Sequence, residues 1–506
     1  MTGDPDAVVI GAGPNGLVAA ATLARAGWSV LVLEANREPG GACRSRALTR
    51  PGFVHDLGAA FFPFAEASPA LAELALEEVG LVWKRAEVES AHPAPDGTCA
   101  SITRDLARAD RAFGGLAEDG RDWRQTIEWF ASCRDDILDM LLSELPPLRS
   151  ALRVGPINLL RFAEIGLSSG RGYGVRHFRS EAARRVLAGL SLHTDIGPDD
   201  PLGAAVGFML GGLAATSGFA VPEGGTSSIT RALVARLEQA GGALRTHCRV
   251  TNLVVREGRV AAVRTSAGDE VVARRAVIAD VAAATLYLKL LDEAEVPSRV
   301  RASMRRFPYG FGTFKVDWAL DGPVPWEHPD AAAAAVVHTG DSLNDLQRFT
   351  DDVRRGRLAE HPYIVLGQQS LPDPTRAPPG QHTLWSYSRV PPQVEGGWRN
   401  AAERYADQFE TRIEAMAPGF RSRILERAIA TPIDLEATNE NLIGGDLGGG
   451  SAQVSNLLFF RPLFPYFRYR TPVAGLYLGS SYTHPGAGVH GMCGYNAAHA
   501  ALRDLG

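Results

Sequence analysis

Short apolar runs alternate with helical patterns at the start of the chain. Residues 7–10 (Ala-Val-Val-Ile) and 29–33 (Ser-Val-Leu-Val-Leu) are almost wholly apolar, which is typical of parallel strands buried on both faces. Residues 17–26 are rich in alanine and leucine, which favours a helix, and Gly27 fits its C-terminal cap. The order strand, helix, strand predicts the α/β class.

Two later parts of the chain repeat this mixture of strands and helices. The first has a helical pattern at 227–240 and a buried strand at 276–279, and the second has a strand at 475–479 followed by a helix at 495–502. We expect these parts to lie beside the N-terminal unit. Between the helix and the strand of the first part come three short β-rich runs, residues 249–255, 260–265 and 271–273.

One stretch, residues 201–222, has to be weighed as a membrane span because it carries no charge and is nearly long enough. It contains five glycines and two prolines, however, and no aromatic residues flank it as an interface belt. We therefore expect a buried helix beside a ligand cavity.

The composition excludes several classes of protein. Of the 506 residues, 45% are hydrophobic and 22% are charged, as in ordinary folded domains. The 52 Lys and Arg against 57 Asp and Glu give a net charge of −5, and no basic domain predicts a nucleic-acid partner. The five cysteines form no CxxC pair, which argues against a disulfide framework and against a metal site, and favours a cytoplasmic location.

A glycine-rich turn follows the first predicted strand directly. Residues 11–16 read Gly-Ala-Gly-Pro-Asn-Gly and match the G-x-G-x-x-G pattern of dinucleotide-binding proteins. The first glycine allows the tight turn, the second lets the backbone approach a diphosphate, and the third lets the helix pack on the strand. N–H groups at the helix N-terminus then bind the diphosphate. The candidate cofactor contacts here are Gly11, Gly13, Pro14, Asn15 and Gly16.

Glu34 ends the second predicted strand at the distance from the glycine turn where an acidic residue binds the ribose hydroxyls. A 2′-phosphate at this place would meet like charge, which costs several kcal/mol. Glu34 and the neighbouring Ala35 therefore favour FAD or NAD over NADP.

Further glycine-rich turns favour FAD. Gly40 and Gly41 form a double-glycine turn that NAD-binding units do not need, whereas the ribityl chain and ring system of FAD need contacts of their own. Residues 485–494 form another such turn before the last helix, whose dipole can stabilise negative charge on a reduced flavin. We predict FAD as the cofactor, with further contacts from Gly40, Gly41, Val250 (at the adenine), Gly479, Gly488, Val489 and Gly491.

Together these motifs resemble those of the phytoene desaturase-related flavoproteins of the amine oxidase and desaturase superfamily, especially their pyridine nucleotide-disulphide oxidoreductase domain-containing branch. The resemblance covers essentially the whole chain and implies an α/β fold. It implies a discontinuous, glutathione-reductase-type Rossmann FAD-binding domain of residues 1–65, 221–295 and 446–506. It also implies an inserted α+β substrate-binding domain of residues 66–220 and 296–445. The segments that carry it are residues 7–34, 40–41, 53–61, 222–225, 373–382, 461–462, 469–472 and 477–498.

The resemblance adds Gly58 and Ala59, within 53–61, and Ala42 and Arg44 to the candidate cofactor contacts. Members of the superfamily often read Gly-Gly-Arg after the second strand. Here Ala42 follows the two glycines and the arginine comes later, at Arg44, so its role at the phosphates is left open.

The resemblance also implies that flavin N5 accepts a hydride from a substrate C–H bond. The uncharged stretch 201–222 and residues 61–64 (Phe-Phe-Pro-Phe) indicate an apolar or amphiphilic small-molecule substrate. The glycines at 486–491 match the dinucleotide pattern but no acidic residue follows at the required distance. We therefore expect reoxidation by oxygen, a quinone or another electron acceptor. The sequence leaves peripheral membrane contact and the oligomeric state open.

Residues 311–320 resemble the amine-oxidase strand that carries a lysine facing flavin N5 through a water. Lys315 is the matching residue, and an exposed strand lysine is the alternative. His484 and His490, in turns near the flavin, are the other catalytic candidates. Three other functions remain open: an amine oxidase producing an imine and hydrogen peroxide, a redox-neutral flavin-dependent isomerase, and a binding module without flavin.

Overall fold

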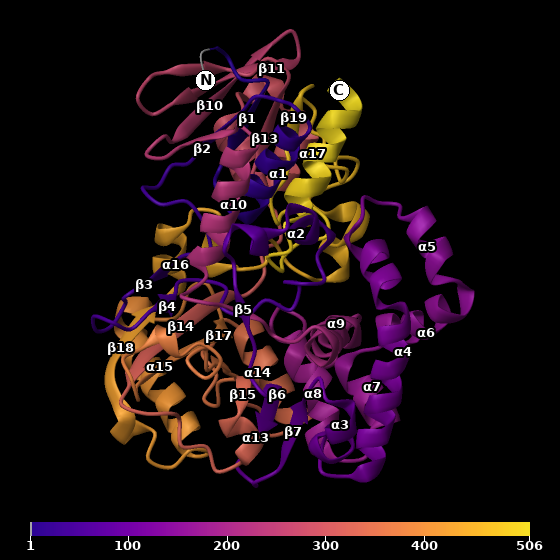
Figure 1. Cartoon of the computed structure of the whole chain (residues 1–506), viewed down its shortest axis with the longest axis vertical. Helices are drawn as coiled ribbons and strands as arrows, with labels where there is room; N and C mark the ends of the chain where they lie inside the picture. The colour runs from indigo at the N-terminus through magenta and orange to yellow at the C-terminus, as the bar shows by residue number, and fades with distance from the viewer. Residues whose placement is uncertain (1–2) are drawn as a thin grey trace.

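The computed structural model describes residues 3–506. Five strands that are far apart in sequence form a parallel sheet in the order β19-β13-β1-β2-β9, in the upper half of Figure 1. All four residues of the central strand are buried, which explains a sequence without polar alternation. The strands are β1 (Ala7–Ile10), β2 (Val30–Leu33), β9 (Ala243–Arg245), β13 (Ala276–Ala279) and β19 (Leu476–Leu478).

Alternate residues of β1 belong to two hydrophobic cores. Ala7 and Val9 join the core that contains the helices α1 (Pro14–Arg25), α10 (Ser227–Gln239) and α17 (Met492–Leu505). Val8 and Ile10 join the core on the other face, which contains the antiparallel strands β10 (Val250–Arg256), β11 (Arg259–Thr265) and β12 (Glu270–Val272). The sheet is therefore a central layer covered on both faces.

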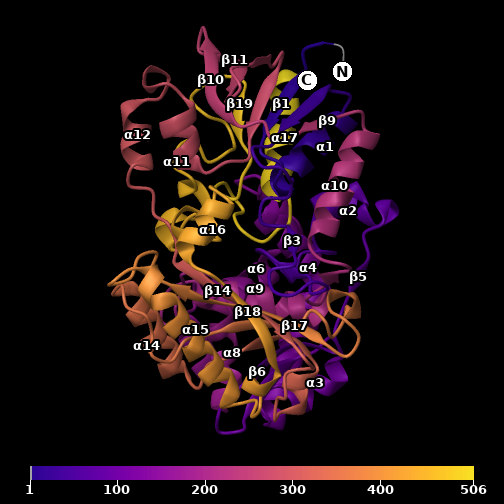
Figure 2. The same ribbon diagram turned by 90° about the vertical axis from the view of Figure 1, so that its left-hand side faces the viewer.

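A seven-stranded mixed sheet lies in the lower half of the molecule (Figures 1 and 2), in the order β18-β14-β17-β16-β15-β6-β7. One face is apolar and packs against α15 (Trp398–Glu414), where Phe314 stacks on Trp398 with ring centroids 5.4 Å apart. The strands are β6 (Val88–Pro93), β7 (Cys99–Ile102), β14 (Gly312–Leu320), β15 (Ala334–His338), β16 (Val365–Gly367), β17 (His382–Val390) and β18 (Ile424–Ala430).

Seven helices form a lobe beside this sheet, on the right of Figure 1. Among them, α9 is the buried helix that the sequence predicted in 201–222, but none of its residues lines the cavity described below. Gly207 allows α9 to approach α8 closely, since a side chain there would collide with the Leu187 carbonyl. In residues 3–506 no helix is long and apolar enough to cross a bilayer. The helices are α3 (Leu106–Ala112), α4 (Ala117–Leu142), α5 (Leu148–Val154), α6 (Pro156–Leu167), α7 (Gly170–His177), α8 (Glu181–Ser191) and α9 (Gly203–Thr216).

The remaining strands and all the remaining helices except α14 are short. The strands among them form two small ribbons, β3 with β4 and β5 with β8. They are β3 (Ser45–Arg46), β4 (His55–Asp56), β5 (Trp83–Lys84) and β8 (Val221–Pro222), with helices α2 (Pro69–Leu74), α11 (Ala283–Thr285), α12 (Ser298–Met304), α13 (Pro329–Ala332), α14 (Leu343–Arg354) and α16 (Pro432–Thr438).

Four strands of the five-stranded sheet and the helices α1, α10 and α17 lie within a few residues of the predicted ranges. The fifth strand, β9, was not predicted by the sequence analysis. Of the seven-stranded sheet only β14 was predicted, as residues 311–320. Its other strands are short or are interrupted by polar residues, so their hydrophobic pattern is weak.

Candidate functional site

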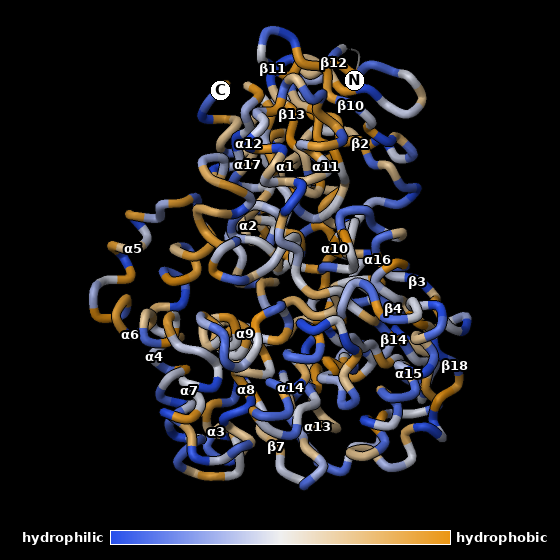
Figure 3. Tube along the Cα trace, turned by 180° about the vertical axis from the view of Figure 1, so that it is seen from behind, coloured by the Kyte–Doolittle hydropathy of each residue, from blue (hydrophilic) through white to orange (hydrophobic). Residues whose placement is uncertain are grey.

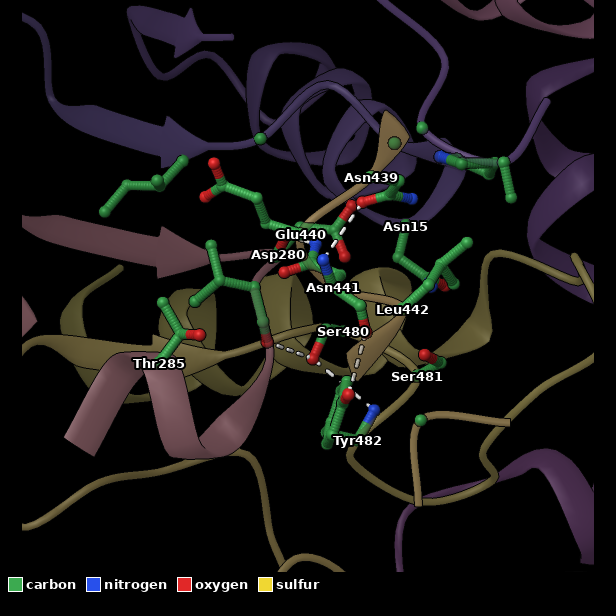
Figure 4. A pocket seen from close by; sticks show the side chains of 18 of the residues that line it. Asn15, Asp280, Thr285, Asn439, Glu440, Asn441, Leu442, Ser480, Ser481 and Tyr482 are labelled. Carbon is green, nitrogen blue, oxygen red and sulfur yellow. Dashed lines mark hydrogen bonds between the residues drawn. The ribbon is translucent and has the colours of Figure 1, made fainter. Parts of the chain in front are cut away.

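A cavity of about 240 Å³ lies at the carboxyl ends of β1, β2 and β13 (Figure 4). In open parallel sheets this edge is where ligands bind. Its walls come from the loops that follow these strands and β19, and from the segment after α16. Eleven predicted contacts line it: Gly11, Gly13, Pro14, Asn15, Glu34, Ala35, Gly41, Ala42, Val250, Gly488 and Val489.

The glycine turn leaves the N-terminus of α1 open toward this cavity. Gly13 is the N-cap of α1 and has no side chain to cap the helix, so the one side-chain acceptor there among residues 3–506 is the carboxylate of Asp280, which bonds to Gly16 N. A Cβ on Gly13 would lie 2.6 Å from Asp280 Oδ2, and one on Gly41 would lie 3.2 Å from the Gly13 Cα. The two glycine turns therefore form a cradle that any side chain would fill. Such a cradle at a helix N-terminus fits a diphosphate.

Glu34 is held in place at one end of the cavity. Its Oε2 accepts a hydrogen bond from Ala12 N at 2.8 Å, and its Oε1 accepts one from Asn36 N at 2.8 Å. Val250 and Arg249 line the same cavity. A buried, fixed carboxylate beside an apolar side chain suits the ribose and adenine of a dinucleotide.

Asp280 is a residue of the cavity that the sequence analysis did not single out. It directly follows β13, and its Oδ2 accepts a hydrogen bond from Gly16 N at 2.9 Å at the start of α1. Burial raises the pKa of Asp280 to about 7, and the nearby Glu34 adds to this shift while the bond from Gly16 opposes it. Its position after a buried parallel strand was the signal that could have identified it.

Another wall of the cavity is built from the loop after β19 and from residues 439–442, which lie beside Asp280 (Figure 4). Tyr482 Oη donates to the Asn441 carbonyl at 2.8 Å, and Ser480 Oγ donates to the Val281 carbonyl at 2.7 Å. These bonds join the loops after β13 and β19 to residues 439–442, which no strand or glycine pattern marked in the sequence.

Seven predicted cofactor contacts are outside the cavity lining: Gly16, Gly40, Arg44, Gly58, Ala59, Gly479 and Gly491. Most of them shape its walls. Gly40 N donates to the Ala12 carbonyl at 2.8 Å. Arg44 donates from Nε to the Gly41 carbonyl and from Nη2 to the Thr438 carbonyl, both at 2.9 Å. Arg44 therefore ties the second glycine turn to α16.

Gly491 and Gly479 act in helix packing. Gly491 is the N-cap of α17, and a Cβ there would lie 2.7 Å from Val18 Cγ2. One on Gly479 would lie 3.1 Å from Ala497 Cβ. Gly488 and Val489, rather than Gly491, bring this turn to the cavity.

Lys315 is buried on β14 and does not line the cavity. Its Nζ pairs with Asp317, two residues along the same face of the strand, and lies 5.8 Å from the ring centroid of Trp385 on β17. Burial lowers the pKa of Lys315, and the charge of Asp317 opposes this shift. The alternative of an exposed lysine is therefore wrong.

Trp385 connects this face of the sheet with the cavity wall. Its Nε1 donates to the Gly58 carbonyl at 3.2 Å. A Cβ on Gly58 would lie 2.5 Å from the Ala42 carbonyl, and Ala42 lines the cavity. Two contacts thus connect Lys315 with the cavity wall: Lys315 lies near the Trp385 ring, and Trp385 bonds to Gly58.

His484 and His490 are buried behind the turn that carries Gly488. His490 Nδ1 accepts a hydrogen bond from Met492 N at 3.0 Å, and its ring packs against Phe64. The Nε2 atoms of both histidines have no hydrogen-bond partner in residues 3–506. Burial lowers the pKa of each to about 4, so both are neutral near pH 7. Neither lines the cavity.

A chain of polar side chains that the sequence analysis missed crosses the same face of the seven-stranded sheet as Lys315. Tyr387 Oη bonds to His193 Nδ1 at 2.8 Å, and His193 Nε2 bonds to His338 Nε2 at 2.8 Å. Ser90 Oγ then bridges His338 Nδ1 and His92 Nε2, each at 3.1 Å. Burial lowers the pKa of His92 and of His193 to about 3. Among residues 3–506 no cluster has the ligands for a metal ion.

The parallel sheet with a glycine cradle at its carboxyl edge is typical of dinucleotide-binding proteins. Residues 15–395 match the family described as flavin containing amine oxidoreductase, so the chain belongs to this family. It is a phytoene desaturase-related enzyme that uses FAD, and the glycine cradle and Glu34 fit the diphosphate and ribose of that cofactor.

Known proteins resemble the chain over almost its full length. It is 30% identical to pyridine nucleotide-disulfide oxidoreductase domain-containing protein 2 of Mus musculus, over 99% of this chain and 94% of that protein. It is 25% identical to the lycopene-forming phytoene desaturase of Pseudescherichia vulneris, over 98% of each chain. The structure of a putrescine oxidase shares the fold, with a TM-score of 0.62, 17% identity and 99% of each chain covered.

Proposed function

We propose that this flavoenzyme is a dehydrogenase or desaturase that removes a hydride from a C–H bond of an apolar or amphiphilic small molecule. The contact of Trp385 with Gly58 carries the proposal, because it brings the face of the seven-stranded sheet against the wall of the cofactor cavity. Relatives of similar length support it, including phytoene desaturases and a limonene dehydrogenase chain of Castellaniella defragrans, which is 23% identical.

The same proposal includes the domain organisation. We assign a glutathione-reductase-type Rossmann FAD-binding domain to residues 1–65, 221–295 and 446–506, and the substrate-binding domain to residues 66–220 and 296–445. The strands of the five-stranded parallel sheet come from the first set, and those of the seven-stranded sheet come from the second set and from no other range. A cytoplasmic location remains a prediction, supported by five buried free thiols.

Bound FAD supplies the hydride acceptor, its N5 atom. The open N-terminus of α1 and the Gly13–Gly41 cradle bind the diphosphate, and Glu34 orients the ribose. Lys315, fixed by Asp317, would face the substrate side, where its Nζ positions water, oxygen or substrate. Reoxidation of the cofactor would need oxygen, a quinone or another electron carrier.

An amine oxidase that forms an imine and hydrogen peroxide is the second candidate. The buried Lys315 beside Trp385 favours it, since the strand that carries Lys315 resembles the lysine strand of amine oxidases. The likeness to putrescine oxidase concerns the fold alone.

Anaerobic bleaching of the flavin absorbance separates these candidates. We expect carotenoid, terpenoid or fatty substrates in detergent to reduce the flavin, and amines to leave it oxidised. Bleaching by amines alone, with peroxide after air is admitted, would replace the proposal by an amine oxidase. Conversion of a substrate to a product of equal mass without net electron transfer would replace it by an isomerase.

A further inference from the structure

A buried arginine lies directly behind one wall of the cofactor cavity. Arg461 belongs to one of the segments that carry the family resemblance, and it is 3% exposed. Its guanidinium lies so close to the turn after β19 that a Cβ on Gly486 would be 3.2 Å from Arg461 Cζ. Gly486 and Ser481 both line the cavity, and Ser481 is labelled in Figure 4. The guanidinium therefore contacts the backbone that forms this wall.

The guanidinium of Arg461 donates to backbone carbonyls. Its Nη2 bonds to the Gly448 and Gly449 carbonyls at 2.7 and 2.9 Å. Ser481 O accepts from Nη2 at 2.7 Å and from Nε at 3.2 Å, and Ser451 O accepts from Nη1 at 3.4 Å. No carboxylate of the described residues 3–506 lies within 4.0 Å of its nitrogen atoms. Burial lowers the pKa of Arg461, but an arginine stays protonated near neutral pH. Arg461 is therefore a buried positive charge without a counter-ion in this part of the chain.

Two carboxylates in the surroundings of Arg461 are bonded to other donors. Asp446 accepts hydrogen bonds from two backbone N–H groups of its own loop, both at 2.7 Å. Asp195 accepts one from Ala452 N, also at 2.7 Å. Their charges act on the pKa of Arg461 only from a distance. The other titratable groups around it are uncharged near pH 7, because burial raises the pKa of the first two and lowers that of the last two: Tyr482, Cys493, His484 and His490.

Apolar residues surround these contacts. Leu463 and Tyr482, next to Arg461 and Ser481 in the chain, belong to the hydrophobic core that covers one face of the five-stranded sheet. Figure 3 shows the chain around β13, in the same core, as mostly hydrophobic. Charges interact more strongly in such surroundings than in water, and a buried charge without a counter-ion is costly. The site therefore favours an anionic group of a bound ligand as the counter-ion of Arg461.

The order of the strands indicates which part of FAD this group is. Glu34 follows β2 and Gly13 follows β1, whereas Gly486 lies in the loop after β19, on the other side of β1 and β13. With the ribose at Glu34 and the diphosphate at Gly13, the ring system of FAD is left to the side of Gly486. Hydride transfer brings two electrons and one proton to this ring system. The reduced ring then carries one negative charge until it takes up a second proton.

We propose that the Arg461 guanidinium is the counter-ion of the reduced flavin ring. Its positive charge is in place before the reaction and meets the negative charge that appears on the ring after hydride transfer. Arg461 thereby raises the reduction potential of the bound FAD and keeps the second proton off the reduced ring. The proposal rests on FAD lying in this cavity and does not depend on the identity of the substrate.

Redox titration of the FAD-loaded full-length protein tests this without any substrate. Arg461→Gln should lower the equilibrium constant for two-electron reduction by about tenfold or more, which lowers the midpoint potential by about 30 mV. Arg461→Lys keeps the charge, and its equilibrium constant should stay within about threefold of that of the natural protein. Arg185→Gln is the matched control and should leave the potential unchanged. Arg185 is 2% exposed and donates to the His92 and Asp341 carbonyls, but it does not line the cavity.

The pH dependence of the potential gives a second readout, which the natural protein alone provides. When one proton accompanies two electrons, the equilibrium constant changes tenfold per pH unit and the potential falls by about 30 mV. We expect this slope in the natural protein between pH 6 and pH 8. Arg461→Gln should show twice this slope at pH 6, because its reduced ring takes up the second proton. Asp280→Asn should keep the one-proton slope, because Asp280 bonds to Gly16 N at the diphosphate.

An unchanged potential in Arg461→Gln, or a two-proton slope in the natural protein, overturns the proposal. So does an equal loss of affinity for oxidised and reduced FAD in Arg461→Gln, because Arg461 would then act on the diphosphate, whose charge does not change on reduction. If Arg461→Gln holds no FAD, the slope of the natural protein decides. Flavin content of Gly13→Ala tests the placement of FAD separately, so a wrong placement and a wrong role for Arg461 give different results.

Discussion

The carboxylate of Asp280 accepts the hydrogen bond from Gly16 N, 2.9 Å away, at the helix N-terminus to which we assign the diphosphate of FAD. The carboxylate of Asp280 and the diphosphate of FAD would therefore both face the N–H groups at the N-terminus of α1. Both can be present when Asp280 is protonated, and burial already raises its pKa to about 7.

FAD affinity should therefore fall as the pH rises through about 7. An ionised Asp280 repels the diphosphate, whereas the protonated acid does not. In Asp280→Asn the affinity should vary less with pH and should exceed that of the natural protein at pH 8 by about tenfold, which is about 1.4 kcal/mol. Titration of the apoprotein with FAD at several pH values measures this. Equal pH dependence in the two proteins would show that Asp280 does not face the phosphates.

Replacing Gly13 by alanine should weaken FAD binding by about tenfold or more. The added Cβ would lie 2.6 Å from Asp280 Oδ2, within the cradle for the diphosphate, while the backbone at Gly13 has an ordinary φ of −71°. Gly166→Ala, in α6, is the control because a Cβ there meets nothing within 4 Å. Flavin content after purification and a dissociation constant check both variants, and a fully loaded Gly13→Ala protein would contradict the cradle.

Lys315→Met should slow anaerobic flavin reduction by more than about threefold if Lys315 acts on the substrate side. It should also lower the free energy of unfolding by on the order of 3 kcal/mol, because Asp317 is left buried without its partner. The double variant Lys315→Met, Asp317→Asn separates the two effects, since it restores stability but not the rate. A rate within threefold of the natural enzyme in the double variant would assign Lys315 to stability alone.

The histidine chain should make the protein less stable in mild acid. Burial holds the pKa of His193 at about 3 and that of His338 well below its ordinary value of 6.5, so the unfolded chain binds protons that the folded protein does not. The stability that depends on keeping these histidines neutral is therefore fully present above pH 6.5. It is lost as the pH falls toward about 3.

Melting temperatures between pH 8 and pH 5, at one ionic strength, measure this loss. His338→Gln should show a smaller decrease across this range, although its melting temperature at pH 8 is lower because the bond to His193 is broken. His361→Gln, at an exposed position, should follow the natural protein. A decrease of equal size in His338→Gln would mean that other groups cause the acid sensitivity.

Local sequence patterns were enough to predict most of the cofactor-binding half of the protein, although they missed β9 and Asp280. The turn 11–16 and Glu34 follow buried strands at fixed distances, and such short-range patterns determine both the fold around them and the ligand that they bind. The structure places eleven of the predicted contacts around one cavity.

The sequence by itself therefore determined the cofactor and the strands that hold it, because those signals depend on neighbours in the chain. Tertiary structure decided the rest. Asp280, Asn441 and the histidine chain come together from segments up to hundreds of residues apart, and no local pattern encodes such pairings. Likewise, Lys315 is buried against Trp385 because β14 pairs with β17 in one register, which only the folded sheet defines.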